Sequence, residues 1–98
     1  MNVVDEIRNE RARQVSAEGW SPQHDDQQLH GELAYAAAAY ALGAPGFWPT
    51  AWPRAHWKPK SRRRDLVRAA ALLVAEIERI DRSDLPAAVE VRKGNVDE

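Results

Sequence analysis

Cysteine is absent from the 98 residues of this chain. Its absence excludes disulfide bonds, thiolate zinc sites and cysteine nucleophiles, and it fits a reducing compartment such as the cytoplasm. No apolar run reaches the roughly 20 residues that a membrane-spanning helix requires, and the N-terminus lacks a signal-peptide pattern. We therefore expect a cytoplasmic protein that does not enter a membrane.

Excess charge of either sign is also lacking, since the formal net charge is −1. The chain therefore gives no general electrostatic reason to bind nucleic acid, which we do not expect as a partner. A chain of this length makes one domain with a small core. We place that domain at residues 1–82 and a C-terminal tail at residues 83–98.

Hydrophobic periodicity and helix-ending glycines predict three helices. The first runs from Val3 to Glu18 and stops at Gly19. It has a thin apolar stripe, with which we expect it to pack while the rest stays in solvent. The stripe consists of Val4, Ile7 and Val15, with Ala12 beside it.

The second predicted helix covers residues 28–42 and stops at Gly43. Its residues 33–42 are apolar almost all round, and most are alanine, which favours helix but offers little area to bury. We therefore expect neighbours to lie close on several sides. Tyr35 and Tyr40 are interpreted as core residues with hydrogen-bonded hydroxyls rather than as catalytic groups.

The third predicted helix begins at the N-cap Ser61 and continues to about Arg82. It carries two apolar rows, and such a helix is either central in the fold or shared with another subunit. We therefore expect a homo-oligomer, because small chains without disulfides often gain core in this way. The first row is Leu66, Ala70, Leu73, Ile77 and Ile80, and the second is Val67, Ala71 and Val74.

Residues 44–61, between the second and third helices, are rich in proline and tryptophan. Proline excludes regular helix or a central strand here, and tryptophan is too apolar to be left in solvent. We expect an ordered loop wrapped over the helices. The fold class predicted is all-α: a compact three-helix domain with this Trp/Pro-rich loop and a loose tail, whose residues 85–91 have the composition for a short strand or a clasp on a partner.

All four tryptophans lie in one third of the chain, beside histidines and carboxylates. An indole face can stack on a nucleobase, whereas a single tryptophan is more often a core residue. Because four lie near polar groups, we expect one or two to face a cavity. The candidates are Trp20, Trp48, Trp52 and Trp57.

A polar cluster follows Trp20, and imidazole and carboxylate groups of this kind bind either metals or ligand hydroxyls. Aspartates just before a helix also serve as N-caps, which is our default interpretation. No compact metal-binding spacing occurs, so we predict neither a metal nor a cofactor. As ligand contacts the candidates are His24, Asp25, Asp26 and His30, with the last three bonding ribose hydroxyls.

A dense basic run occupies residues 58–64. Cations at a helix N-terminus oppose the helix dipole, and an anionic ligand would offset that cost. Lys58, Arg62 and Arg63 are therefore candidate phosphate contacts. The alternative is a solvated surface in which Glu6, Glu10 or Asp65 neutralises the arginines. Both interpretations stay open.

The order of these motifs resembles that of a family of small, mostly uncharacterised bacteriophage proteins over about residues 8–82. The resemblance implies a location in an infected bacterial host and no established activity. The motifs that carry it are Glu10-Arg11, Glu18-Gly19-Trp20, His24-Asp25-Asp26, Gly31-Glu32-Leu33, Ala37, Tyr40-Ala41, Trp48-Pro49, Trp57-Lys58-Pro59 and residues 62–67 and 75–79.

Part of the same set of motifs is similar, more distantly, to the ryanodine-receptor repeat domain. The matching elements are Gly19-Trp20, Asp25-Asp26, His30 and residues 62–67. Bacterial relatives of that repeat are thought to sense nucleotide-derived signals. The resemblance therefore implies a sponge that sequesters an immune second messenger, such as a cyclic nucleotide or a cyclic ADP-ribose isomer.

Three functions remain after these observations. The leading one is a non-catalytic binding protein for a nucleotide-like small molecule. The first alternative is a Mg-dependent nucleotide pyrophosphohydrolase, for which Glu78 and Asp81 supply half of a carboxylate signature and the second helix offers only Glu32. The second alternative is a protein–protein inhibitor that acts through the tail or the aromatic loop.

Overall fold

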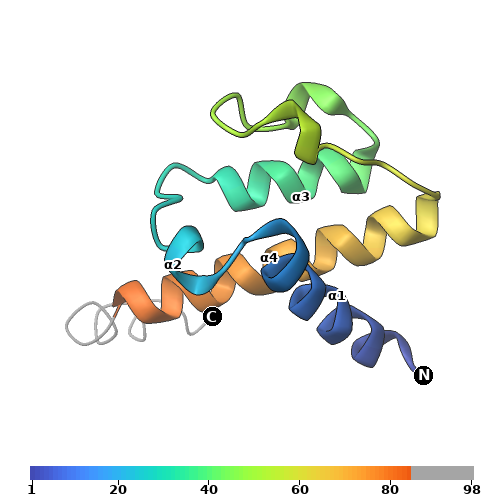
Figure 1. Ribbon diagram of the computed structural model, residues 1–98, viewed down its shortest axis with the longest axis horizontal. Helices are drawn as coiled ribbons and strands as arrows, with labels where there is room; N and C mark the ends of the chain where they lie inside the picture. The colour runs from blue at the N-terminus through green and yellow to red at the C-terminus, as the bar shows by residue number, and fades with distance from the viewer. Residues whose placement is uncertain (85–98) are drawn as a thin grey trace, which may run out of the picture.

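The computed structural model describes residues 1–84, which are helical and contain no strand (Figure 1). The all-α prediction is confirmed for these residues. The predicted helices correspond to α1, α3 and α4, whereas α2 and two 3₁₀ turns were not predicted. The elements are α1 (Val3–Glu18), α2 (Pro22–Asp25), α3 (Glu32–Leu42), η1 (Pro45–Phe47), η2 (Arg54–His56) and α4 (Arg62–Asp84).

Helices α3 and α4 lie side by side and run in opposite directions (Figure 1). The Trp/Pro loop covers α3 on the side away from α4, while α1 crosses α4. Helix α4 continues through Asp84, so Ser83 belongs to the helix rather than to the predicted tail. The rest of that tail, residues 85–98, lies outside the described residues.

Helix α1 has the predicted bounds, but its packing differs from the prediction. Its buried residues are Glu10 and Gln14, whereas Val4 is 58% exposed. The reason is that α1 faces the arginines of α4. Arg64 forms an ion pair with Glu10, and the Gln14 amide donates a 3.3 Å hydrogen bond to the Arg68 carbonyl. A polar face can be buried here because most of its groups find partners, although Oε1 of Gln14 has none among the described residues.

Helix α3 begins at Glu32, four residues after the predicted start. Gly31 precedes it with a φ of 83°, a left-handed conformation that glycine adopts without a steric penalty. The Tyr40 hydroxyl donates to the His56 carbonyl at 3.1 Å and accepts from the Lys58 amide at 3.0 Å, as expected of a core tyrosine. The same prediction is wrong for Tyr35, which is 53% exposed.

The N-cap of α4 is confirmed, because the Ser61 hydroxyl accepts a hydrogen bond from the Arg64 amide at 3.2 Å. The first predicted apolar row of α4 is not part of the core, since Leu66, Leu73 and Ile77 are exposed. Contacts with α1 and α3 occupy the other sides of the helix. The residues that α4 buries are Asp65, Val67, Arg68, Ala69, Ala71, Leu72 and Ala75.

The Trp/Pro loop is ordered over the helices, as predicted. The Trp48 indole donates to the Pro53 carbonyl at 3.3 Å, and the Trp52 indole donates to the Gln28 side chain at 2.8 Å. The core combines these rings with residues of α3 and α4, chiefly Trp20, Leu33, Tyr40, Trp48, Trp52 and Leu72. No helix in residues 1–84 is long and apolar enough to cross a membrane.

Candidate functional site

A cleft of about 380 Å³ opens where the end of α1, α2 and the second half of the Trp/Pro loop meet. We call it the Trp20 cleft. Three of the residues predicted for the site line it, together with five others. Its lining consists of Glu18, Trp20, His24, Gln28, Ala51, Trp52, Pro53 and His56.

The Trp20 indole is surrounded by other rings. The imidazoles of His24 and His56 lie at centroid distances of 6.5 and 5.8 Å, with interplanar angles of 21° and 28°. The Trp52 ring lies 5.2 Å away. Trp20 is 4% exposed, so a ligand meets only a small part of its surface. The indole both supports the fold and borders the cleft.

His24 is held by a buried carboxylate. Its Nδ1 lies 2.8 Å from Oδ1 of Asp25, whose side chain is completely buried and also forms an ion pair with Arg11. Because an ionised carboxylate only accepts hydrogen bonds, Nδ1 donates, and Nε2 becomes the acceptor of the neutral ring. The ring at the cleft therefore has a fixed orientation, and within residues 1–84 its Nε2 has no hydrogen-bond partner.

The N-cap interpretation of Asp25 is wrong. Asp25 is the last residue of α2, whose N-cap is Ser21, and the N-cap of α3 is Gly31, without a side-chain cap. Asp26 forms an exposed ion pair with Arg82 at 2.7 Å. The two aspartates thus serve tertiary ion pairs, which a helix-start pattern cannot distinguish from caps.

Glu18 supplies the negative charge at the cleft. Arg13 lies 3.3 Å from its Oε2, and Lys58 Nζ lies 3.2 Å from both oxygens. The His56 Nδ1 lies 3.4 Å from Oε1. The carboxylate is buried whereas Lys58 is half exposed, so Lys58 is free to turn toward a bound anion.

The predicted phosphate-binding arginines lie elsewhere. Arg63 forms a bidentate pair with Glu6 at 2.8 and 2.9 Å, and the Arg62 guanidinium donates to the Ala41 carbonyl. The hydrogen bond from Arg63 lowers the pKa of Glu6 below its ordinary value. Arg64 likewise pairs with Glu10. Acids of the first helix therefore neutralise Arg63 and Arg64, as the alternative interpretation held, whereas Arg62 donates to a backbone carbonyl.

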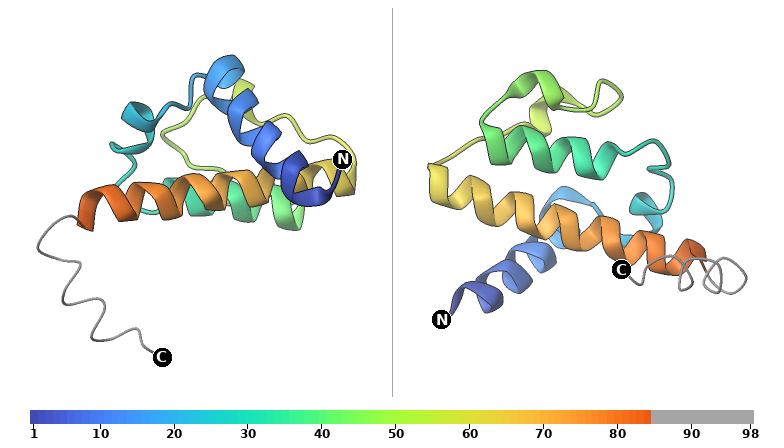
Figure 2. Two further views of the ribbon diagram at one scale, coloured as in Figure 1. Left: turned by 90° about the horizontal axis from the view of Figure 1, so that it is seen from below. Right: turned by 180° about the vertical axis from the view of Figure 1, so that it is seen from behind.

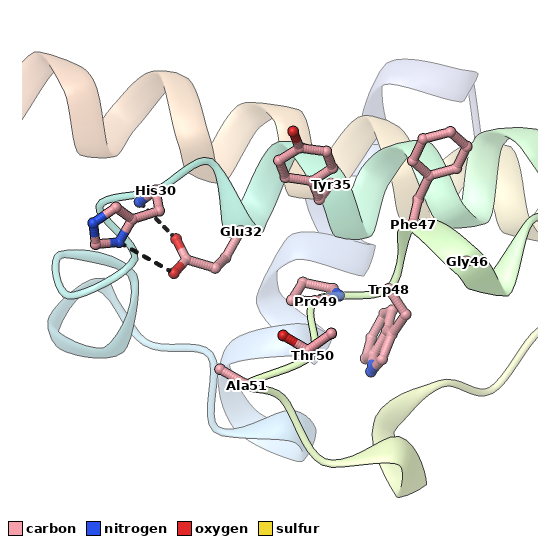
Figure 3. Close-up of a pocket in the computed structure, with 9 residues that line it drawn as sticks. All are labelled: His30, Glu32, Tyr35, Gly46, Phe47, Trp48, Pro49, Thr50 and Ala51. Carbon is pink, nitrogen blue, oxygen red and sulfur yellow. Dashed lines mark hydrogen bonds and ion pairs between the residues drawn. The ribbon is translucent and has the colours of Figure 1, made fainter.

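Two further predicted residues, His30 and Trp48, border a second pocket of about 300 Å³ (Figure 3). At one end the His30 amide donates to the Glu32 carboxylate at 2.8 Å. In Figure 3, Tyr35 and Phe47 point to the same side, and Trp48 points away from them. The Trp57 ring is tilted against that of Tyr40, with 4.7 Å between the ring centroids, and Trp57 lines neither pocket. The structure therefore brings three of the predicted residues together at the Trp20 cleft, places two at the second pocket and leaves the others outside both linings.

Glu18, Gln28 and His56 line the Trp20 cleft but were not predicted from the sequence. Glu18 and His56 stand far apart in the chain and form no recognisable motif, although Glu18 belongs to the Glu18-Gly19-Trp20 pattern. Within residues 1–84, no three histidine or carboxylate side chains gather as a metal site. Comparison with protein-family models, curated proteins and solved structures finds no significant match. The site itself is therefore the basis for assigning a function.

Proposed function

We propose that this chain is a non-catalytic binding protein for a nucleotide-derived small molecule and that the Trp20 cleft is its binding site. The convergence of two imidazoles and a carboxylate on an aromatic-lined cleft of about 380 Å³ carries the proposal. Small-molecule sites are typically concave, largely apolar and supplied with a few fixed polar groups.

Each polar group has a suitable role toward a nucleotide. Nε2 of His24 accepts a hydrogen bond from a ribose hydroxyl or a base N–H, because Asp25 occupies Nδ1. The Glu18 carboxylate accepts from base N–H donors at the cleft. Lys58, which forms an ion pair with Glu18, is the cation that we assign to a phosphate. Of the three predicted phosphate contacts, this assignment keeps Lys58. It leaves out Arg62 and Arg63, which bond to the Ala41 carbonyl and to Glu6.

Under this proposal the ligand class follows the resemblance to the ryanodine-receptor repeat, and the location follows the resemblance to bacteriophage proteins. The protein would act as a sponge in the cytoplasm of an infected bacterial host, holding a cyclic nucleotide or a cyclic ADP-ribose isomer. Sequestration requires tight binding without turnover, and a cleft whose groups are already fixed by neighbours favours affinity.

The test is a sequestration assay with nucleotides and cyclic nucleotides, run with and without magnesium. The purified chain is incubated with each compound and filtered, and the filtrate is chromatographed. The retained protein is then heated and its released compounds are chromatographed. A compound that disappears from the filtrate and returns intact on heating supports the sponge.

Other outcomes identify the alternatives. A compound that reappears altered only when magnesium is present indicates the pyrophosphohydrolase and refutes the non-catalytic proposal. Retention unchanged in a Glu18→Gln, His56→Ala double variant places the ligand outside the Trp20 cleft. A panel that stays entirely in the filtrate contradicts nucleotide binding for the compounds used and favours a protein partner.

A further inference from the structure

An apolar stripe runs along α4 on the surface. Its members follow one another at intervals of four, three, four and three residues, the spacing of a helix that packs against another helix. Leu73 is 46% and Ile77 is 59% exposed. We call this stripe the α4 seam; it consists of Leu66, Ala70, Leu73, Ile77 and Ile80.

The α4 seam lies opposite the surface that α1 covers. Leu73 follows Arg64 by nine residues, which is two and a half helical turns, so the two side chains point to opposite sides of α4. Arg64 reaches α1 through Glu10. In the left view of Figure 2, α1, α2 and the loop rise from one side of the layer that α3 and α4 form, and the other side carries no described element.

The apolar surface extends beyond the seam toward α1. Val74 lines a groove of about 350 Å³ together with Val4 and Ile7. Arg8, Arg11 and Glu78 also line this groove. A contiguous apolar surface of this kind, bordered by charged groups, is characteristic of a protein interface.

The charges at the two ends of the seam identify the occupant. Arg62, an exposed residue whose guanidinium also donates to the Ala41 carbonyl, stands four residues before Leu66. Asp81, also exposed, stands four residues after Ile77. When two copies of α4 pair in opposite directions, Arg62 of each copy meets Asp81 of the other. A parallel pair would place like charges together. The seam is thus self-complementary about a twofold axis, as a homodimer interface must be.

We propose that a second copy of this chain docks on the α4 seam in an antiparallel arrangement, centred between Ala70 and Leu73. The interface is on a different surface from the Trp20 cleft, so it does not depend on the function proposed above. Each subunit then covers the apolar row that is exposed on the other subunit.

Sedimentation equilibrium of the full chain tests the proposal from about 1 µM to about 1 mM, the range of moderate dimer affinities. We expect a concentration-dependent dimer. Leu73→Asp should weaken it by at least about 100-fold, since a leucine is lost from each subunit. Because Leu73 is outside the core, the helix content of the variant should equal that of the wild type. Phe47→Asp, at a comparably exposed residue outside α4, should leave the dimer intact.

Charge exchange tests the direction of pairing. Arg62→Asp and Asp81→Arg should each weaken the dimer by about tenfold, because two contacts become repulsive in each homodimer. An equimolar mixture of the two variants should restore association, since both contacts in the mixed dimer are attractive. Single variants that dimerise like the wild type would overturn the antiparallel arrangement. A wild-type chain that remains monomeric to about 1 mM, or a different protein that occupies the seam, would overturn the proposal.

Discussion

The Nδ1 atom of His24 lies 2.8 Å from Oδ1 of Asp25, a carboxylate with no exposed surface. The other oxygen of that carboxylate faces Arg11. One buried charge therefore ties α1 to α2 and orients an imidazole at the Trp20 cleft. Stability and site geometry depend on the same side chain.

Asp25→Ala should reduce the free energy of unfolding by about 3–5 kcal/mol, because it leaves Arg11 without its partner in a largely buried place. Asp26→Ala is the matched control, since the neighbouring residue loses only an exposed ion pair with Arg82. That change should cost less than about 1 kcal/mol. Urea denaturation of both variants measures the difference. Equal losses would contradict the buried role of Asp25.

The Tyr40 hydroxyl fixes the end of the Trp/Pro loop that carries His56. Tyr40→Phe should cost about 1–2 kcal/mol, since the His56 carbonyl and the Lys58 amide both lose a partner. Tyr35→Phe should have an effect within about 0.5 kcal/mol, because its side chain is exposed. Thermal and urea unfolding provide the comparison, and a Tyr35 variant as destabilised as the Tyr40 variant would refute this assignment.

The acid dependence of stability should reflect Glu10. Burial raises the pKa of Glu10, but hydrogen bonds from Arg13 and Gln14 and the charges of Arg13 and Arg64 outweigh burial and hold it below the ordinary 4.5. A carboxyl group with a lowered folded-state pKa stabilises the fold fully above its unfolded-state pKa. That stabilisation is lost as the pH falls through the folded-state value.

Urea unfolding between pH 7 and pH 3 tests this dependence. The wild type should lose stability as the pH falls below 4.5, the ordinary value for glutamate. Glu10→Gln should be less stable at neutral pH and should show a smaller decline in acid. Glu6→Gln, at the exposed Arg63 pair, is the control and should follow the wild-type curve more closely. Identical pH profiles for wild type and Glu10→Gln would contradict the assignment.

The helix bounds could be predicted where a local signal marks them. Gly19 and Gly43 end helices in left-handed conformations, and Ser61 caps α4. The packing could not be predicted in the same way. A helix with two apolar rows does not reveal which row its neighbours cover, and α4 exposes the row that has the most regular spacing. Helix α1 packs through polar residues because their partners lie 54 residues away along the chain.

The site shows the same division. Trp20, His24 and Trp52 meet at one cleft, as their clustering in the sequence indicated. The arginines do not join them, because α1 crosses α4 and brings Glu6 to Arg63. Three residues of the cleft could be predicted from the sequence. The ion pairs between helices could not, because they depend on how the helices cross.

Trp48 illustrates the limit of mutating tryptophans to find a site. Its ring is buried among Tyr40, Trp52 and Trp57. Trp48→Ala should therefore reduce the free energy of unfolding by about 3–5 kcal/mol, as removal of a large core ring does. Loss of binding in this variant would therefore report on the fold rather than on a binding site. Chemical denaturation is the measurement, and an unchanged midpoint would contradict the core assignment.

Nuclear magnetic resonance of the four indole N–H groups tests the central claim most directly, because it requires no variant for the binding measurement itself. The chain, labelled with ¹⁵N, is titrated with nucleotides and cyclic nucleotides, and single Trp→Phe variants assign the signals. We predict that a ligand shifts the Trp20 and Trp52 signals in a saturable way, while Trp57, outside the cleft, changes least. Titrations in which neither signal moves, or in which Trp57 responds first, would contradict binding at the Trp20 cleft.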